Sequence, residues 1–387
     1  MSKINVLKMN KIADCGLAEL PQDKFDVSDS ITNPEGILVR SAKVTDLNGE
    51  LLAIARAGAG TNNIPVDHCT KKGIVVFNTP GANANGVKEL AITSLMLASR
   101  KIYDGIQWTQ TLDPASDVPT QVEKGKSQFA GPEILGKTLG VIGLGAIGGL
   151  VANAASMLGM KVVGYDPHLS VDGAWNLHSS IEKATKEDEV YSKIDYLSVH
   201  IPVLPETRGK FNKDFFAKVK KGVRIINFSR EELFNNTDLL QAIEDGIVET
   251  YVTDFPSGEL LGHPKIITIP HLGSSTPESE DTCAVMAGAQ LRDYILHGNI
   301  RNSVNFPATH LPHGNETRVC VFNENKADVL GKLTHILGEA GLNINEMVNR
   351  AKGDVAYTII DLDKSSADVP IDKIQGIPEV IRARVIN

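Results

Sequence analysis

The chain has little cysteine. Its four cysteines, Cys15, Cys69, Cys283 and Cys320, are scattered over 387 residues, with no C-x-x-C pair and no spacing typical of metal ligands. Isolated thiols of this kind are typical of proteins in a reducing compartment, where disulfides are rare. We therefore expect a cytoplasmic protein without disulfides and without a metal site.

Positive charge is also in short supply. Lysine and arginine number 39 against 47 acidic residues, which gives a formal net charge of −8. This balance excludes a general attraction to nucleic acid or to an anionic membrane. An anionic substrate would need a local basic pocket, so individual arginines become informative.

A sustained apolar segment is missing from the first residues, so we expect no secretory signal. The uncharged stretch between Lys137 and Lys161 is rich in glycine and alanine, and its pattern changes from strand to helix. This change excludes a membrane-spanning helix. With 42% hydrophobic and 22% charged residues, the chain is globular and long enough for two or three domains.

Short apolar runs alternate with helical segments along most of the chain, which predicts parallel sheets covered on both faces. The predicted strands are residues 4–9, 37–39, 52–55, 74–77, 138–142, 162–165, 196–199, 224–227, 249–253 and 266–269. Helical patterns cover residues 87–99 and 278–296. Two polar segments, 112–129 and 299–307, are predicted to be a loop and a linker.

The pattern changes after Pro307. Strand-like runs at 317–322, 344–349, 355–362 and 380–386 are interrupted by a helical pattern over 326–340 and a short one near Ile371. The order β-α-β-β-α-β predicts a ferredoxin-like module. It carries no obvious catalytic cluster, which favours a binding or assembly role.

The segment from Thr138 to Asp166 carries a dinucleotide-binding fingerprint. A predicted strand meets Gly143, Gly145 and Gly148 in G-x-G-x-x-G spacing, and a helix and a second strand ending at Asp166 follow. The glycines permit a tight turn, backbone contact with a pyrophosphate and close packing of the helix. An acid at this position accepts hydrogen bonds from the adenosine ribose and repels a 2′-phosphate, which favours NAD over NADP.

Three later segments supply an arginine, a glutamate and a histidine, each at or just past the end of a predicted strand. They are 225–230 (IINFSR), 253–259 (TDFPSGE) and 269–276 (IPHLGSST). Open α/β sheets place ligands at this edge. With this set, and with 39–43 (VRSAK), 56–63 (RAGAGTNN), 76–80 (VFNTP), 298–307 (GNIRNSVNFP) and 381–385 (IRARV), the chain resembles the D-isomer-specific 2-hydroxyacid dehydrogenases over its whole length.

The resemblance implies three domains. Residues 1–98 with 276–306 would form a substrate-binding domain, and residues 99–275 an NAD-binding domain, each a Rossmann- or flavodoxin-like doubly wound parallel sheet. Residues 307–387 would form a ferredoxin-like ACT regulatory domain. The resemblance further implies that the protein uses NAD to oxidise 3-phosphoglycerate to 3-phosphohydroxypyruvate, the first step of serine biosynthesis. We also expect the protein to form a homodimer or homotetramer.

The resemblance also implies the catalytic roles. His271 would accept the hydroxyl proton of a 2-hydroxy acid while C2 gives a hydride to nicotinamide. Glu259 would hold the imidazole in place and favour its protonated form. Arg230 would bind the substrate carboxylate and the C2 oxygen with its planar fork.

The remaining site residues follow from the same resemblance. Cofactor contacts are expected from Gly143, Gly145, Ala146, Ile147, Gly148, Asp166, Ile201, Phe228, Ser229, Arg230, Asp254, His271, Gly273 and Ser274. Substrate contacts are expected from Arg40, Ser41, Arg56, Ala57, Gly58, Ala59, Gly60 and Asn83, with Arg40 and Arg56 near the phosphate. Contacts with an L-serine effector are expected from Asn323, Asn325 and Asn343.

Two alternatives remain open at this point. One is a reductase for glyoxylate, hydroxypyruvate or another D-2-hydroxyacid, which would need neither a phosphate-binding Arg40 nor an ACT domain. The other is a non-catalytic, NAD-sensing corepressor, a type built on the same fold. A turnover assay distinguishes an enzyme from the second alternative.

Overall fold

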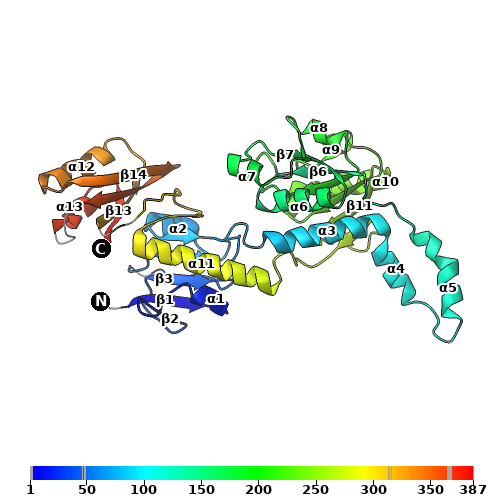
Figure 1. Ribbon diagram of the computed structural model, residues 1–387, viewed down its shortest axis with the longest axis horizontal. Helices are drawn as coiled ribbons and strands as arrows, with labels where there is room; N and C mark the ends of the chain where they lie inside the picture. Colours follow the sequence, from blue (N-terminus) through cyan, green and yellow to red (C-terminus); the bar gives the residue numbers. More distant parts are fainter. Residues whose placement is uncertain are drawn as a thin grey trace. The chain divides into compact units, whose positions relative to one another are not determined.

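The computed structural model describes residues 3–386, apart from 46, 48, 313, 315 and 364–367. The chain divides into two compact units. The first unit comprises Met1–Ala82 and Pro277–Asn387, and the second comprises Asn83–Thr276. Figure 1 shows the elements of each unit, coloured along the sequence.

The first unit contains a five-stranded parallel sheet in the order β2-β1-β3-β4-β5. Its strands are β1 (Ile4–Met9), β2 (Phe25–Ser28), β3 (Gly36–Val39), β4 (Ala53–Arg56) and β5 (Val75–Phe77). The helices α1 (Asp14–Leu17), α2 (Val66–Lys71) and α11 (Pro277–His297) accompany it. All four residues of β3 are buried, as expected for a strand covered on both faces. The edge strand β2 was not predicted, because its apolar run is short.

The C-terminal part of the first unit is an antiparallel sheet in the order β14-β15-β13-β16. Its elements are β13 (Thr317–Glu324), α12 (Val329–Glu339), β14 (Ile344–Lys352), β15 (Val355–Leu362), α13 (Ile371–Gln375) and β16 (Val380–Ile386). This confirms the predicted β-α-β-β-α-β order. Leu333 and Leu337 of α12 pack against Val319 and Val321 of β13, because a four-stranded sheet must bury one apolar face under its helices.

The prediction of a linker over residues 299–307 was wrong. Ile300 and Phe306 are fully buried, and Asn305 is 7% exposed. Phe306 lies against Phe322 of β13, with ring centroids 4.4 Å apart. Both belong to the apolar core that the parallel sheet shares with α11 and the C-terminal sheet. The segment looked polar because its asparagines face backbone groups: Asn305 Oδ1, for example, accepts from Val76 N at 2.9 Å.

Two arginines, Arg318 and Arg384, join the C-terminal sheet to the end of α11. Arg318, fully buried, donates to both carboxylate oxygens of Asp361 at 2.7 Å and to the carbonyl of His297. Arg384 donates to the carbonyls of Tyr294 and Ile295, and its guanidinium lies 4.4 Å from the Tyr294 ring centroid. The last carbonyls of a helix need partners and attract cations, so both arginines stabilise this end of α11.

The second unit contains a seven-stranded parallel sheet in the order β12-β11-β10-β9-β6-β7-β8. Its strands are β6 (Thr138–Ile142), β7 (Lys161–Tyr165), β8 (Glu182–Lys183), β9 (Tyr196–Val199), β10 (Val223–Asn227), β11 (Val248–Thr253) and β12 (Ile266–Thr268). Its helices include α3 (Ala84–Arg100), α4 (Ile102–Thr109), α6 (Ala146–Met157), α7 (Val171–Trp175), α8 (Asp188–Tyr191), α9 (Lys213–Phe216), α10 (Asn236–Glu244) and the 3-10 turn η2 (Glu231–Leu233). The order is that of a doubly wound α/β sheet, as predicted.

The prediction of a loop over residues 112–129 was also wrong. The segment contains α5 (Val118–Gly125) and the 3-10 turn η1 (Lys126–Phe129). The carboxylate of Asp117 caps α5 by accepting from Thr120 N at 3.4 Å. The helix is only eight residues long, contains Pro119 and has just two other apolar side chains, Val118 and Val122, so its helical pattern is too short to stand out in the sequence.

Candidate active site

The three fingerprint glycines form the turn between β6 and α6. Gly143 has φ +88°, and a side chain there would lie 2.4 Å from the His200 carbonyl oxygen. A Cβ at Gly148 would lie 1.9 Å from the Gly143 oxygen, so α6 approaches the turn more closely than any other residue allows. A Cβ at Gly145 would meet nothing within 4 Å, which leaves open space above the start of α6, at Ala146 and Ile147. The turn fits a pyrophosphate group held by helix N-terminal amides.

Asp166 follows the end of β7 and stabilises the glycine turn through hydrogen bonds. Its Oδ2 accepts from Leu144 N at 2.9 Å and its Oδ1 from His168 N at 2.8 Å. A carboxylate oxygen has a second lone pair, so both oxygens keep an acceptor site for ribose hydroxyls. The acid therefore combines a structural role with the expected contact to the ribose.

The other residues predicted to contact the cofactor lie at the carboxyl edge of neighbouring strands. Ile201 follows β9, Ser229 and Arg230 follow β10, and Asp254 follows β11. Ser229 Oγ donates to the Val199 carbonyl at 2.6 Å, which ties the end of β10 to the end of β9. Phe228 is buried beside them.

The side chain of Arg230 is exposed at this edge. Its Nη1 donates to the Ser229 carbonyl at 2.6 Å, and its own carbonyl accepts from Asn227 Nδ2 at 2.9 Å. The remaining guanidinium donors are free of partners among the described residues. The backbone is therefore held firmly while the fork remains available to a carboxylate.

His271 pairs with a buried carboxylate in this structure. Its Nδ1 lies 3.1 Å from Asp254 Oδ2, and the Asp254 side chain is 1% exposed whereas that of His271 is 57% exposed. The imidazole also contacts the Phe255 ring, with centroids 5.2 Å apart. A carboxylate on Nδ1 sets the tautomer of the ring and leaves Nε2 for substrate.

Glu259, the predicted partner of His271, is not brought to it. Its side chain is exposed, and no hydrogen bond or ion pair joins it to another of the described residues. Burial raises the pKa of Asp254 above its usual range, although the neighbouring His271 and Arg230 act in the opposite direction. Asp254 Oδ1 has no hydrogen-bond partner in the described part of the chain. Asp254 is thus a costly buried charge, which is typical of functional sites.

The first unit carries a separate glycine-containing loop at residues 57–60, where substrate contacts are predicted. Gly58 has φ +151°, and a Cβ there would lie 2.7 Å from Arg56 Nη1, so the guanidinium rests against the loop. Gly58 N donates to Thr79 Oγ1 at 2.8 Å and Ala57 N to the Val39 carbonyl. The amides of Ala59 and Gly60 have no acceptor among the described residues. Two free amides beside an arginine suit a carboxylate or phosphate.

Arg40 lies at the end of β3 and is already paired. Its Nη2 is 2.7 Å from Glu280 Oε1, and both side chains are about two fifths exposed. The Arg40 carbonyl accepts from Arg56 Nε at 3.0 Å, which links the two arginines. Ser41 N donates to Asn10 Oδ1. An anion at Arg40 would compete with Glu280.

The other predicted residues lie at helix ends, in a loop and in a buried strand. Asn83 precedes α3 without capping it through its side chain. Gly273 is buried, and a Cβ there would lie 3.0 Å from Val87 Cγ2, while Ser274 is half-buried. Asn323 is buried in β13, whereas Asn325 and Asn343 lie beyond opposite ends of α12. An 11-residue helix spans about 16 Å, so the structure does not bring Asn325 and Asn343 together.

Three residues with roles at these sites were not predicted. Thr79 supports the Gly58 amide, Glu280 pairs with Arg40, and His200 lies beneath the glycine turn with Nε2 2.8 Å from Ser198 Oγ. Burial lowers the pKa of His200 to about 4, so this ring is neutral at physiological pH. The histidine has a sequence signal in its place directly after β9, and Thr79 in its place within the segment 76–80. The pairing of Glu280 with Arg40 becomes visible only when distant segments meet.

Two classes of feature are missing from the described residues. None of their helices is both long and apolar enough to cross a membrane. Nor do three or more of their histidine, cysteine or acidic side chains gather in a way that would hold a metal ion.

Comparisons with known proteins agree with this geometry. Residues 92–273 match the family described as D-isomer specific 2-hydroxyacid dehydrogenase, NAD binding domain. A D-3-phosphoglycerate dehydrogenase of Synechocystis sp. is 32% identical over 397 residues, covering 99% of this chain and 66% of the relative. One of Bacillus subtilis is 32% identical, covering 78% of this chain and 59% of the relative. The chain thus spans about half to two thirds of the length of the curated relatives it matches.

Solved structures share the fold. An NAD⁺-bound 3-phosphoglycerate dehydrogenase of Entamoeba histolytica has a TM-score of 0.60 at 24% identity, covering 79% of this chain and 99% of that one. A D-mandelate dehydrogenase of Rhodotorula graminis has a TM-score of 0.65 at 23% identity, covering 77% and 96%. The glycine turn, the residues that follow β9 to β12 and the matched family together lead to one conclusion: the chain belongs to the D-isomer specific 2-hydroxyacid dehydrogenases and carries their NAD-binding domain.

Proposed function

We propose that this protein is a D-3-phosphoglycerate dehydrogenase, which uses NAD to oxidise 3-phospho-D-glycerate to 3-phosphohydroxypyruvate in the first step of L-serine biosynthesis. The observation that carries the proposal is the pairing of His271 with the buried Asp254 at the edge that also holds the glycine turn. Similarity to D-3-phosphoglycerate dehydrogenases supports the choice of substrate. Bound NAD supplies the hydride acceptor.

Residues of the second unit accept the proton and bind the groups attached to the reacting carbon. His271 Nε2 accepts the C2 hydroxyl proton as C2 loses its hydride, and the Asp254 carboxylate at Nδ1 favours the resulting imidazolium. Arg230 binds the substrate carboxylate and the C2 oxygen through its free donors. In the reverse direction the same imidazole returns the proton. Glu259 stays in the proposal as a residue that can join His271 after its segment rearranges.

The first unit supplies groups for the anionic ends of the substrate. The free amides of Ala59 and Gly60, with Arg56, suit a carboxylate, and Arg40 suits a phosphate that replaces Glu280 as its partner. A phosphate dianion competes well with a single carboxylate that is half exposed. This requirement for a second anion distinguishes the proposed substrate from glyoxylate and from hydroxypyruvate.

A substrate panel tests the proposal. Oxidation of NADH is followed with 3-phosphohydroxypyruvate, hydroxypyruvate and glyoxylate, and with His271→Ala as the control for catalysis. We expect the phosphorylated substrate to have the highest kcat/KM, and His271→Ala to lose at least about a hundredfold in kcat while still binding NADH. Preference for glyoxylate would indicate a reductase. Failure to turn over any substrate would favour the NAD-sensing corepressor.

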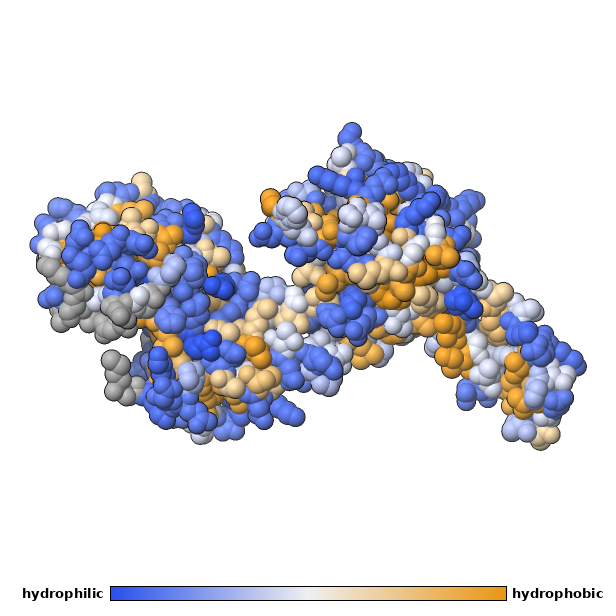
Figure 2. All heavy atoms as spheres, in the orientation of Figure 1, coloured by the Kyte–Doolittle hydropathy of each residue, from blue (hydrophilic) through white to orange (hydrophobic). Residues whose placement is uncertain are grey.

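We also propose that the protein forms a homodimer or homotetramer through the segment of α4 and α5. Ile102, Tyr103 and Ile106 of α4 are 41%, 46% and 55% exposed, and neither helix has a buried residue. Figure 2 shows hydrophobic residues on this projecting segment. Exposed apolar groups at helical spacing are typical of an interface. Light scattering should show that Ile106→Asp lowers the mass of the assembly, whereas Tyr103→Phe should not.

We assign residues 1–98 with 276–306 to substrate binding, 99–275 to NAD binding and 307–387 to an ACT module. The module is the proposed site for L-serine. Because Asn325 and Asn343 lie at opposite ends of α12, one serine would reach both only if two copies of the module pair. Inhibition by L-serine that is lost in Asn343→Ala supports this assignment, and calorimetry without heat at millimolar serine contradicts it.

A further inference from the structure

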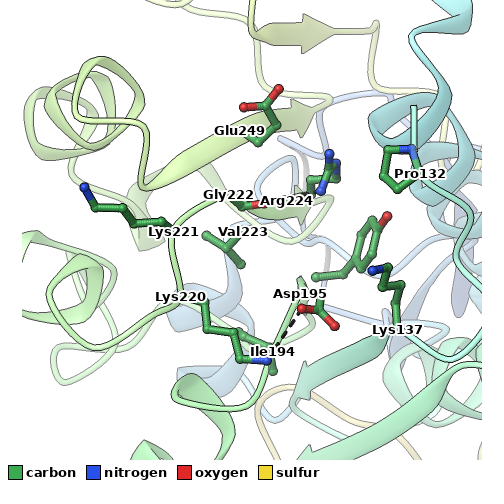
Figure 3. Close-up of a pocket in the computed structure, with 11 residues that line it drawn as sticks. Pro132, Lys137, Ile194, Asp195, Lys220, Lys221, Gly222, Val223, Arg224 and Glu249 are labelled. Carbon is green, nitrogen blue, oxygen red and sulfur yellow. Dashed lines mark hydrogen bonds and ion pairs between the residues drawn. The ribbon is translucent and has the colours of Figure 1, made fainter. Parts of the chain in front are cut away.

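A pocket at the amino-terminal ends of β6, β9 and β10 has no part in the proposed reaction. This amino-edge pocket encloses about 290 Å³ and is lined by Pro132, Lys137, residues 194–196, residues 220–224 and Glu249 (Figure 3). The glycine turn follows the opposite end of β6. A strand of five residues separates the two sites by about 16 Å. The pocket is therefore distinct from the dinucleotide site.

More cationic than acidic side chains line the amino-edge pocket. Its lining includes Lys137, Lys220, Lys221 and Arg224 but only two carboxylates, Asp195 and Glu249. Both carboxylates are engaged. Asp195 accepts from Thr138 N at 2.8 Å and lies 3.5 Å from Lys220 Nζ, and Glu249 lies 3.5 Å from Lys265 Nζ.

Arg224 is half-buried and held in place. Its Nε donates to the Ala98 carbonyl at 3.0 Å, its Nη1 donates to the Gly222 carbonyl at 3.3 Å, and its guanidinium lies 5.6 Å from the Tyr196 ring centroid. Nη2 has no acceptor within the described ranges. A guanidinium fixed in this way loses little freedom on binding an anion, and partial burial strengthens its attraction.

Lys137 is the second cation available to a ligand. Figure 3 shows its side chain extending toward the middle of the pocket, whereas the side chain of Lys221 extends away from it. No carboxylate pairs with Lys137 in the described part of the chain. We propose that the amino-edge pocket binds a small multivalent anion, a phosphorylated or polycarboxylate metabolite, between Lys137 and Arg224. The volume is near the lower limit for small-molecule sites, which suits a compact ligand.

Calorimetry with pyrophosphate tests the site. The titration is done at constant ionic strength with NAD at saturation, so that the glycine turn is already filled. We expect Lys137→Ala to weaken binding by about tenfold or more, the loss typical of one charged hydrogen bond. Lys221→Ala removes the same charge from the loop before β10, yet it should change the affinity by less than about twofold, because the Lys221 side chain extends away from the pocket and its charge is screened by solvent.

Three outcomes overturn the proposal. Equal weakening by both variants would indicate general attraction to the basic surface. Binding that is unchanged in Lys137→Ala would place the anion elsewhere, at Arg40 or Arg56 for example. Failure to detect heat with the wild-type protein at millimolar pyrophosphate would leave Arg224 with the purely structural role of capping α3. Displacement of pyrophosphate by citrate would support a site for both phosphorylated and polycarboxylate ligands. If citrate does not displace pyrophosphate, the site is specific for phosphorylated ligands.

Discussion

Replacing Asp254 with asparagine tests which carboxylate positions His271. Asp254 Oδ2 lies 3.1 Å from His271 Nδ1, and its side chain is 1% exposed. Asparagine keeps the shape and an acceptor for Nδ1–H but removes the charge that favours imidazolium. A hydrogen bond to a charged group contributes about 1.5 to 3 kcal/mol. We therefore expect kcat/KM to fall by between about 10-fold and about 150-fold.

The same substitution should have the opposite effect on stability. Burial raises the pKa of Asp254, so the folded protein binds this proton more tightly than the unfolded chain does. Stability therefore falls as pH rises from the ordinary aspartate pKa through the raised one, and above it the buried charge carries its full cost. Asp254→Asn should match or exceed the wild-type thermal midpoint at neutral pH, and this advantage should disappear in acid.

The assay combines steady-state kinetics with 3-phosphohydroxypyruvate and NADH at neutral pH with thermal melts at neutral and acidic pH. Glu259→Gln is the matched control, since it makes the same chemical change at an exposed carboxylate. If Glu259→Gln loses more kcat/KM than Asp254→Asn, the role of positioning His271 belongs to Glu259. A lower midpoint for Asp254→Asn at neutral pH would refute the argument from burial.

Three other substitutions test other parts of the account. Asp166→Ala should raise kcat/KM with NADP relative to NAD, since it removes the ribose acceptor and the charge that repels a 2′-phosphate, and an unchanged ratio would assign cofactor choice elsewhere. Arg40→Ala should raise KM about tenfold for the phosphorylated substrate but little for hydroxypyruvate, and equal losses would remove Arg40 from the phosphate site. Arg318→Leu should cost about 3 to 5 kcal/mol in urea denaturation because it leaves Asp361 buried and unpaired, whereas the double variant with Asp361→Leu should cost much less. Similar costs for the single and double variants would show that the ion pair is not the cause.

The features that the sequence alone determined are local ones. The turn between β6 and α6 could be predicted because Gly143, Gly145, Gly148 and Asp166 lie within one βαβ unit, where spacing sets geometry. The order of elements in the C-terminal sheet followed from alternating and helical periodicities in the same way. The exposed helix α5 was missed because eight residues with only two apolar side chains besides Pro119 give too short a pattern to recognise.

Only the tertiary structure decided which side chains meet. Asp254 and Glu259 are both acids in one short segment, and the sequence does not tell which of them faces His271. The answer depends on the paths of the loops that follow β11 and β12. The contact of Arg56 with Gly58 likewise requires a positive φ at Gly58, which no sequence pattern predicts. The segment 299–307 looked polar, yet its residues Ile300 and Phe306 lie in a core shared by two sheets. Burial and charge pairing depend on residues far apart in the chain, so no local pattern contains them.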